Sequence, residues 1–136
     1  MTLPASSVAP DTATVDYDWA AFRLVPDVCR GGGETVGVVL HARRARYLGL
    51  RFRPDAAGRG PGVDPDLLAR VLTGLERVAA GGPEGGPIGL LPPSERFHWL
   101  TATRSTVLQP TPVHTGRTTD PAAALDALYR ALVGDD

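Results

Sequence analysis

Three strand-like runs follow one another in the first half of the chain, with only short links between them. They are YDWAAFRLVPDV (residues 17–28), ETVGVVLHA (34–42) and RYLGLRFR (46–53). Aromatic and β-branched residues are frequent in the first run, which is expected to end near Pro26. In the third run, Leu48, Leu50 and Phe52 alternate with residues of the opposite face. Because links this short favour antiparallel neighbours, the sequence predicts a meander that turns at RGGG and again at RRA near Arg43.

The second run alternates between two faces. The expected faces carry Val36, Val38 and Leu40 on one side and Val39 and His41 on the other. Gly37 lies in the middle of this run, where the lack of a side chain weakens a strand. We therefore expect a bulge at Gly37, or a close approach of neighbouring backbone.

Two main helices are predicted in the second half, and each begins at an Asp-Pro pair. Asp64 is a suitable N-cap, Pro65 occupies the first helical position, and GGPEGGP (81–87) ends the helix. The apolar stripe of this helix consists of Leu67, Leu68, Val71, Leu72, Leu75, Val78 and Ala79. Asp120 and Pro121 repeat the start signal for the closing helix. The core face of the closing helix consists of Leu125, Leu128, Tyr129 and Leu132.

The region between the two main helices holds shorter elements. PPSERFHWL (92–100) predicts a short helix that Ser94 can cap. A short strand is expected over residues 105–109, followed by a proline-stiffened extended loop that ends at Gly116.

Together these elements predict an α+β fold. A small antiparallel sheet of three to four strands is covered, mainly on one face, by two main helices and one short helix. We expect a single domain over residues 16–134, preceded by a disordered leader of small and polar residues over 1–15.

The composition excludes several classes of activity. All 14 basic residues are arginine, so the chain has neither a Walker-type phosphate loop nor a Schiff-base lysine. This bias, with abundant Ala, Gly and Pro, is typical of a GC-rich bacterial genome. A net charge of −1 gives no overall attraction to nucleic acid or to a membrane. Cys29 is the only cysteine, which excludes an intramolecular disulfide and suits a cytoplasmic protein.

Neither catalysis nor metal binding has a strong signal. Ser105, His114 and Asp120 occur in a chain order compatible with a catalytic triad, but no G-x-S-x-G nucleophile motif is present. We expect Ser105 and Thr106 to bond to backbone and Asp120 to cap a helix. The three histidines, His41, His98 and His114, lack the spacing of metal ligands, so no metal or other cofactor is expected.

Arginines cluster around the second predicted turn. The cluster consists of Arg43, Arg44, Arg46, Arg51 and Arg53, within eleven residues that contain no acid. On a hairpin this strip, with Tyr47 inside it, can bind phosphate, an acidic protein surface or nucleic acid. The alternative is an edge strand that charge protects against aggregation.

The segment RSTVLQPTPVHTG (104–116) is polar and is held extended by two prolines. With a nearby arginine it supplies the candidate binding residues Arg96, Arg104, Ser105, Thr106, Gln109, His114 and Thr115. One reading is a rigid corner whose side chains bond to their own backbone. The other is a loop that presents these side chains to a partner or small ligand.

The chain resembles the bacterial family called domain of unknown function 3037. The resemblance rests on YDWAAFRLVP, on the G-V-x-L of the second strand, and on RFHWL followed by RSTVLQPTPVHTG, and it spans residues 17–133. In RGGGETVGV this chain has glycines and Thr35 where the family pattern has an acidic pair, a Phe and an Asn. The resemblance implies no established reaction, but it implies a small companion subunit, since family genes often lie beside a gene for a HipA-like kinase-fold protein.

Three functions follow as hypotheses. The first is a non-enzymatic accessory module that binds a HipA-like kinase-fold or biosynthetic partner through Arg104, Gln109 and His114, together with Arg96. The second is a small enzyme or anionic-ligand-binding protein that uses Arg104, Ser105 and His114. The third is nucleic-acid binding through the strip from Arg43 to Arg53.

Overall fold

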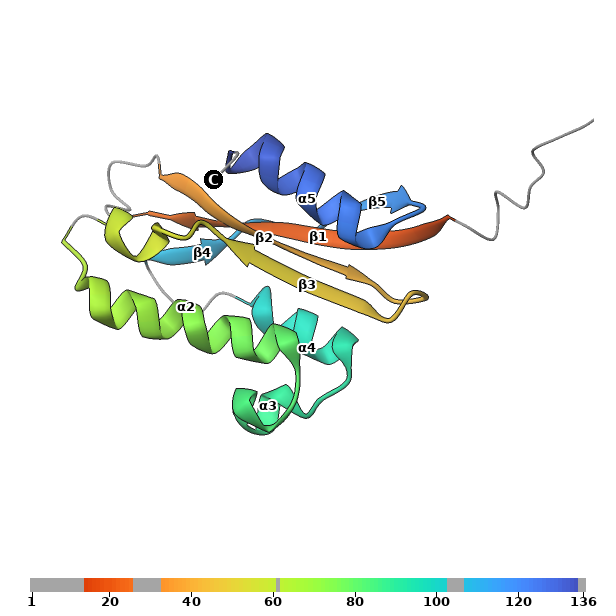
Figure 1. The fold of residues 1–136 in the computed structure, drawn as a ribbon, viewed down its shortest axis with the longest axis horizontal. Coiled ribbons are helices and arrows are strands. Elements are labelled where there is room, and N and C mark those ends of the chain that lie inside the picture. Colours follow the sequence, from red (N-terminus) through yellow and green to blue (C-terminus); the bar gives the residue numbers. More distant parts are fainter. Residues whose placement is uncertain (1–13, 26–32, 61, 103–106, 135–136) are drawn as a thin grey trace, which may run out of the picture.

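The computed structural model describes residues 14–25, 33–60, 62–102 and 107–134, and within them it shows an α+β fold built on a five-stranded sheet (Figure 1). The strands are β1 (Val15–Leu24), β2 (Glu34–Ala42), β3 (Tyr47–Phe52), β4 (Leu108–Pro110) and β5 (His114–Thr118). The α-helices are α2 (Pro65–Ala80), α3 (Gly86–Gly89), α4 (Pro93–Leu100) and α5 (Pro121–Leu132). Two 3₁₀ turns, η3 (Ala56–Arg59) and η4 (Pro83–Gly85), follow β3 and α2. The predicted fold class is confirmed, with one strand more than the upper estimate.

The first three strands form the predicted antiparallel meander, in the spatial order β3-β2-β1. The free edge of β1 then pairs with two short strands, β4 along Phe22–Leu24 and β5 along Val15–Trp19. The prediction of an extended loop up to Gly116 is therefore wrong for its last residues, which belong to β5. The five residues of β5 are His, Thr, Gly, Arg and Thr, so no alternation of apolar side chains marks them as a strand.

Helices cover both faces of the sheet, which corrects the expected cover of mainly one face. Figure 1 shows α2, α3 and α4 on one side and α5 on the other. The first core, between the sheet and α2 and α4, includes Ala20, Phe22, Leu24, Val39, Phe52, Leu72 and Phe97. The second core, between the sheet and α5, includes Val38, Leu40, Ala42 and Leu125, with Tyr17 and Trp19 packed against it. Because successive side chains of β1 project from opposite faces, this strand contributes residues to both cores.

The predicted irregularity at Gly37 is confirmed. Phe22 lies opposite Gly37 and Arg23 lies opposite Thr35, so β2 has one extra residue, Val36, at a bulge. The bulge places Val36 in the first core, although Val38 and Leu40 belong to the second. The expected shared face of these three residues is therefore wrong for Val36. The Phe52 ring lies over Gly37, where a Cβ atom would collide with it.

Both main helices begin as predicted. The Asp64 carboxylate accepts a hydrogen bond from the Asp66 N–H at 3.0 Å, and Asp120 accepts one from the Ala123 N–H at 3.2 Å. The expected cap by Ser94 is wrong, because Pro92 occupies the N-cap of α4 and no described side chain caps that helix. The predicted apolar faces of the two helices include Leu67, Val71 and Leu132, but these three side chains are exposed.

Two glycine substitutions test the close approach at Gly37. Replacing Gly37 with alanine is expected to lower the free energy of unfolding by about 1–3 kcal/mol, because the Phe52 ring must move. Replacing Gly74 is the matched control. Gly74 lies inside α2, and no atom of the described residues lies within 4 Å of an added Cβ there, so alanine is expected to add up to about 1 kcal/mol. Urea unfolding measures both, and equal stability of the two variants would contradict the packing described.

Candidate functional site

Arg96, a predicted binding residue, is used inside the chain. Its guanidinium donates hydrogen bonds to the carbonyls of Leu91 at 2.9 Å, Val78 at 3.0 Å and Ala79 at 2.7 Å. The last two carbonyls belong to the final turn of α2, where helix carbonyls lack partners within the helix. Arg96 therefore caps α2 from α4 and ties the two helices together.

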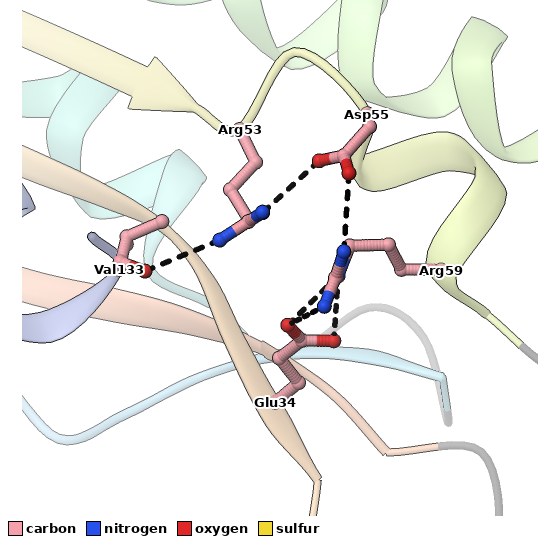
Figure 2. Close-up of polar contacts among 5 residues, drawn as sticks. All are labelled: Glu34, Arg53, Asp55, Arg59 and Val133. Atoms are coloured by element: carbon pink, nitrogen blue, oxygen red, sulfur yellow. Dashed lines mark hydrogen bonds and ion pairs between the residues drawn. The ribbon is translucent and has the colours of Figure 1, made fainter. Parts of the chain in front are cut away.

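The predicted arginine strip is divided in the folded chain. Arg51 forms an ion pair with Asp126 of α5 at 3.2 Å, and its guanidinium lies 3.9 Å from the centre of the Tyr129 ring. Arg53 contacts the Asp55 carboxylate at 3.0 Å and donates to the Val133 carbonyl at 3.3 Å (Figure 2). Asp126 and Asp55, which lie outside the strip, pair with Arg51 and Arg53, so the strip is not a continuous basic surface.

A carboxylate–arginine network continues from Arg53 to the start of β2 (Figure 2). The Arg59 guanidinium contacts Asp55 at 3.1 Å and both carboxylate oxygens of Glu34 at 2.6–2.8 Å. Hydrogen bonding to Arg59 lowers the pKa of Glu34. Hydrogen bonding to Arg53 is the largest of the causes that lower the pKa of Asp55. The network joins η3 to the beginning of β2.

The other three arginines of the strip lie at the turn between β2 and β3. Arg43, Arg44 and Arg46 are exposed, and no acidic side chain of the described chain lies within ion-pair distance of them. The Arg46 N–H donates to the Arg43 carbonyl at 3.1 Å, which closes the turn. Arg46 has a φ of 53°, a left-handed conformation that few side chains other than Asn and Asp adopt readily.

The late polar segment is partly described. Arg104, Ser105 and Thr106 lie outside the described residues. Gln109 is on β4, directly opposite Arg23 of β1, and His114 is on β5, directly opposite Trp19.

Opposite residues of paired strands project from the same face, and Trp19 and Arg23 are four positions apart on one strand. Gln109 and His114 therefore share a sheet face with Arg23 and Trp19. We call these four residues the Arg23–His114 face. Thr115 pairs with Asp18 and projects from the opposite face, so it does not join this set.

The Arg23–His114 face lies beside the part of the sheet that α5 covers. α5 packs chiefly on β2 and β3, and β4 and β5 pair with the far edge of β1. His114 is exposed, and the other three residues of the face are half-buried. The His114 ring lies 4.9 Å from the Trp19 ring, centre to centre, and the Arg23 guanidinium donates to the Gly33 carbonyl at 3.3 Å.

Trp19 and Arg23 were not among the predicted binding residues. Their signal in the sequence was the spacing of four along a strand, which places both on one face. The pairing that brings Gln109 and His114 to them joins residues about 90 positions apart, and no local pattern reports it.

The remaining candidates separate in space. The Asp120 carboxylate caps α5, as expected. His41 pairs with Asp18 and lies on the α4 side of the sheet, His98 is exposed on α4, and His114 lies on the α5 side. Among the described residues no group of three or more His, Cys, Asp and Glu side chains is placed to hold a metal ion.

The Glu34–Arg59 contact predicts a particular dependence of stability on acid. Because the folded-state pKa of Glu34 lies below its unfolded value of about 4.3, the ion pair stabilises the fold above that pH and its contribution is lost as the pH falls through the folded-state pKa. Replacing Glu34 with Gln is expected to flatten the fall of the melting temperature between about pH 5 and pH 3. Replacing Glu76, an exposed carboxylate of α2, is the control and should leave the slope unchanged. Equal slopes for wild type and Glu34→Gln would contradict the role given to this contact.

No helix within the described segments is long and apolar enough to cross a membrane.

Comparison with known proteins identifies the family of this chain. No curated protein and no solved structure matches the chain significantly. The model of one family, described as a protein of unknown function (DUF3037), matches residues 19–133, which covers every element from the middle of β1 to the end of α5. The chain therefore belongs to the DUF3037 family, as its YDWAAFRLVP and RSTVLQPTPVHTG segments predict.

Proposed function

We propose that this chain is a non-enzymatic accessory module that binds a partner protein through the Arg23–His114 face. The observation that carries the proposal is the gathering of an arginine, a glutamine, a tryptophan and a histidine on a sheet face beside α5. Tryptophan and arginine are the residue types that most often dominate the energy of protein interfaces. The partner we favour is a HipA-like kinase-fold protein in the bacterial cytoplasm.

The chemistry of the face suits contact with another protein. The Trp19 and His114 rings contact each other and offer aromatic surface to a partner. The guanidinium of Arg23 adds hydrogen-bond donors on the same face. No acidic side chain of the described chain is within ion-pair distance of Arg23, so a carboxylate of the partner can pair with it. Gln109 supplies both a donor and an acceptor next to Arg23.

The nucleic-acid alternative loses its main support. It required five arginines in one strip, and two of them, Arg51 and Arg53, are engaged by carboxylates. The enzyme alternative relied on Arg104 and Ser105, which lie outside the described residues, and on His114, whose ring contacts the Trp19 ring in a tilted arrangement.

Co-expression with the kinase-fold protein tests the proposal. Wild-type chain is expected to co-purify with it, and Arg23→Glu combined with His114→Ala is expected to weaken association by at least about tenfold, since two contacts of the face are lost. Isothermal calorimetry gives the affinities, and thermal melts check that each variant is folded.

The matched control is Arg130→Glu combined with Thr115→Ala, which changes the same number of charges at exposed positions off this face. This control should bind within about twofold of wild type. Failure of the two folded wild-type proteins to associate would remove the proposed partner, and equal losses in both double variants would remove the proposed face.

A further inference from the structure

We propose that a second site, at the turn between β2 and β3, binds a phosphate monoester group. It is a cavity of about 280 Å³ between this turn and the start of α4. Its lining consists of His41, Arg43, Arg46, Pro92, Pro93 and Ser94. His41 lies on the α4 side of the sheet, so the site is separate from the Arg23–His114 face and does not rest on the function proposed above.

His41 is the buried polar group that points to a ligand. It is 6% exposed, and neither ring nitrogen has a hydrogen-bond partner in the described part of the chain. Its ring stacks on Phe97, with centres 5.5 Å apart and planes at 28°, and His41 lines the cavity. An imidazole buried without a partner is unfavourable, and an anion in the cavity would accept its N–H.

Charges of both signs lie near His41, and those in the cavity lining are cationic. Burial lowers the pKa of His41 most, the Asp18 carboxylate opposes this, and Arg43 and Arg96 lower the pKa further. At neutral pH the imidazole is therefore an uncharged donor beside a fixed positive guanidinium. Arg96 is held by carbonyls of α2 and Leu91, which leaves Arg43 and Arg46 as the cations that line the cavity.

The start of α4 supplies the remaining donors. Among the described residues no side chain caps this helix, Pro93 has no N–H, and the N–H groups of Glu95 and Arg96 both donate to the Pro92 carbonyl. Ser94 lines the cavity at the start of the helix. Its hydroxyl and N–H are therefore donors within the lining, at the positive end of the helix dipole, where anions bind favourably.

These donors match a phosphate monoester better than a carboxylate. Two guanidiniums, a hydroxyl, an imidazole N–H and a helix end suit a tetrahedral dianion with three free oxygens, and none of the lining residues is acidic. The group can come from a small metabolite or from a phosphorylated side chain of a protein, and the probes below separate these sources.

Titration of the full chain by ¹H–¹⁵N NMR tests the site, with inorganic phosphate, glycerol 3-phosphate and a phosphoserine peptide as probes. We expect binding at about 1 mM or tighter, with shifts at the turn, at Ser94 and at the His41 ring. Combined Arg43→Ala and Arg46→Ala should weaken binding by at least about tenfold. Arg44→Ala is the matched control, because Arg44 is an exposed arginine of the same turn that does not line the cavity, and it should bind within about twofold of wild type.

The three probes and an acetate control decide the outcome. Similar affinities for glycerol 3-phosphate and the peptide support a metabolite as the source, and a peptide that binds at least about tenfold more tightly supports a phosphorylated protein. No shift at these residues with any probe at about 10 mM would overturn the proposal. It would equally be overturned if acetate bound as well as phosphate, or if Arg44→Ala weakened binding as much as the double variant, since either result indicates only general charge attraction.

Discussion

Every layer of this molecule depends on the pairing of β1 along both of its edges. β2 occupies one edge, and β4 and β5 share the other, so β1 is the strand that joins the meander to the end of the chain. Its alternation sends Phe22 and Leu24 into the first core and Trp19 towards the second. One strand thereby fixes which side each helix covers and which polar side chains stand together on the Arg23–His114 face.

The arginines of this chain have different roles, which depend on whether carbonyls, carboxylates or a cavity lie next to each guanidinium. Arg96 satisfies carbonyls at the end of α2, and Arg59 holds Glu34 and Asp55 together beside the first core. Arg43 and Arg46 meet no carboxylate in the described chain and line a cavity with a buried histidine. A planar guanidinium with five donors serves both uses, because it binds several carbonyls at once or grips an anion with two parallel hydrogen bonds.

Local chemistry made much of the fold predictable, and the limits of the prediction follow the same logic. The Asp-Pro pairs at 64–65 and 120–121 predict helix starts, because each Asp caps N–H groups of the first helical turn. Gly37 predicts a bulge because it lacks a side chain. β5 was missed because its stability comes from hydrogen bonds to β1, about 100 residues away, rather than from its own residue pattern. Polarity alone singled out Gln109 and His114, which strand pairing places on the Arg23–His114 face, and also Arg96, which is a helix cap.

The order of the helices and the first three strands, and the family, were already determined by short-range signals: period, caps, turns and the YDWAAFRLVP and RSTVLQPTPVHTG segments. Tertiary structure alone decided which side chains meet. Arg23 lies opposite Gln109 and Trp19 lies opposite His114 through strand pairing, and His41 lines one cavity with Arg43 and Ser94. The reason is physical: a cap or a turn is satisfied by its neighbours in the chain, whereas a binding surface exists only when strand register and packing bring distant side chains to one face.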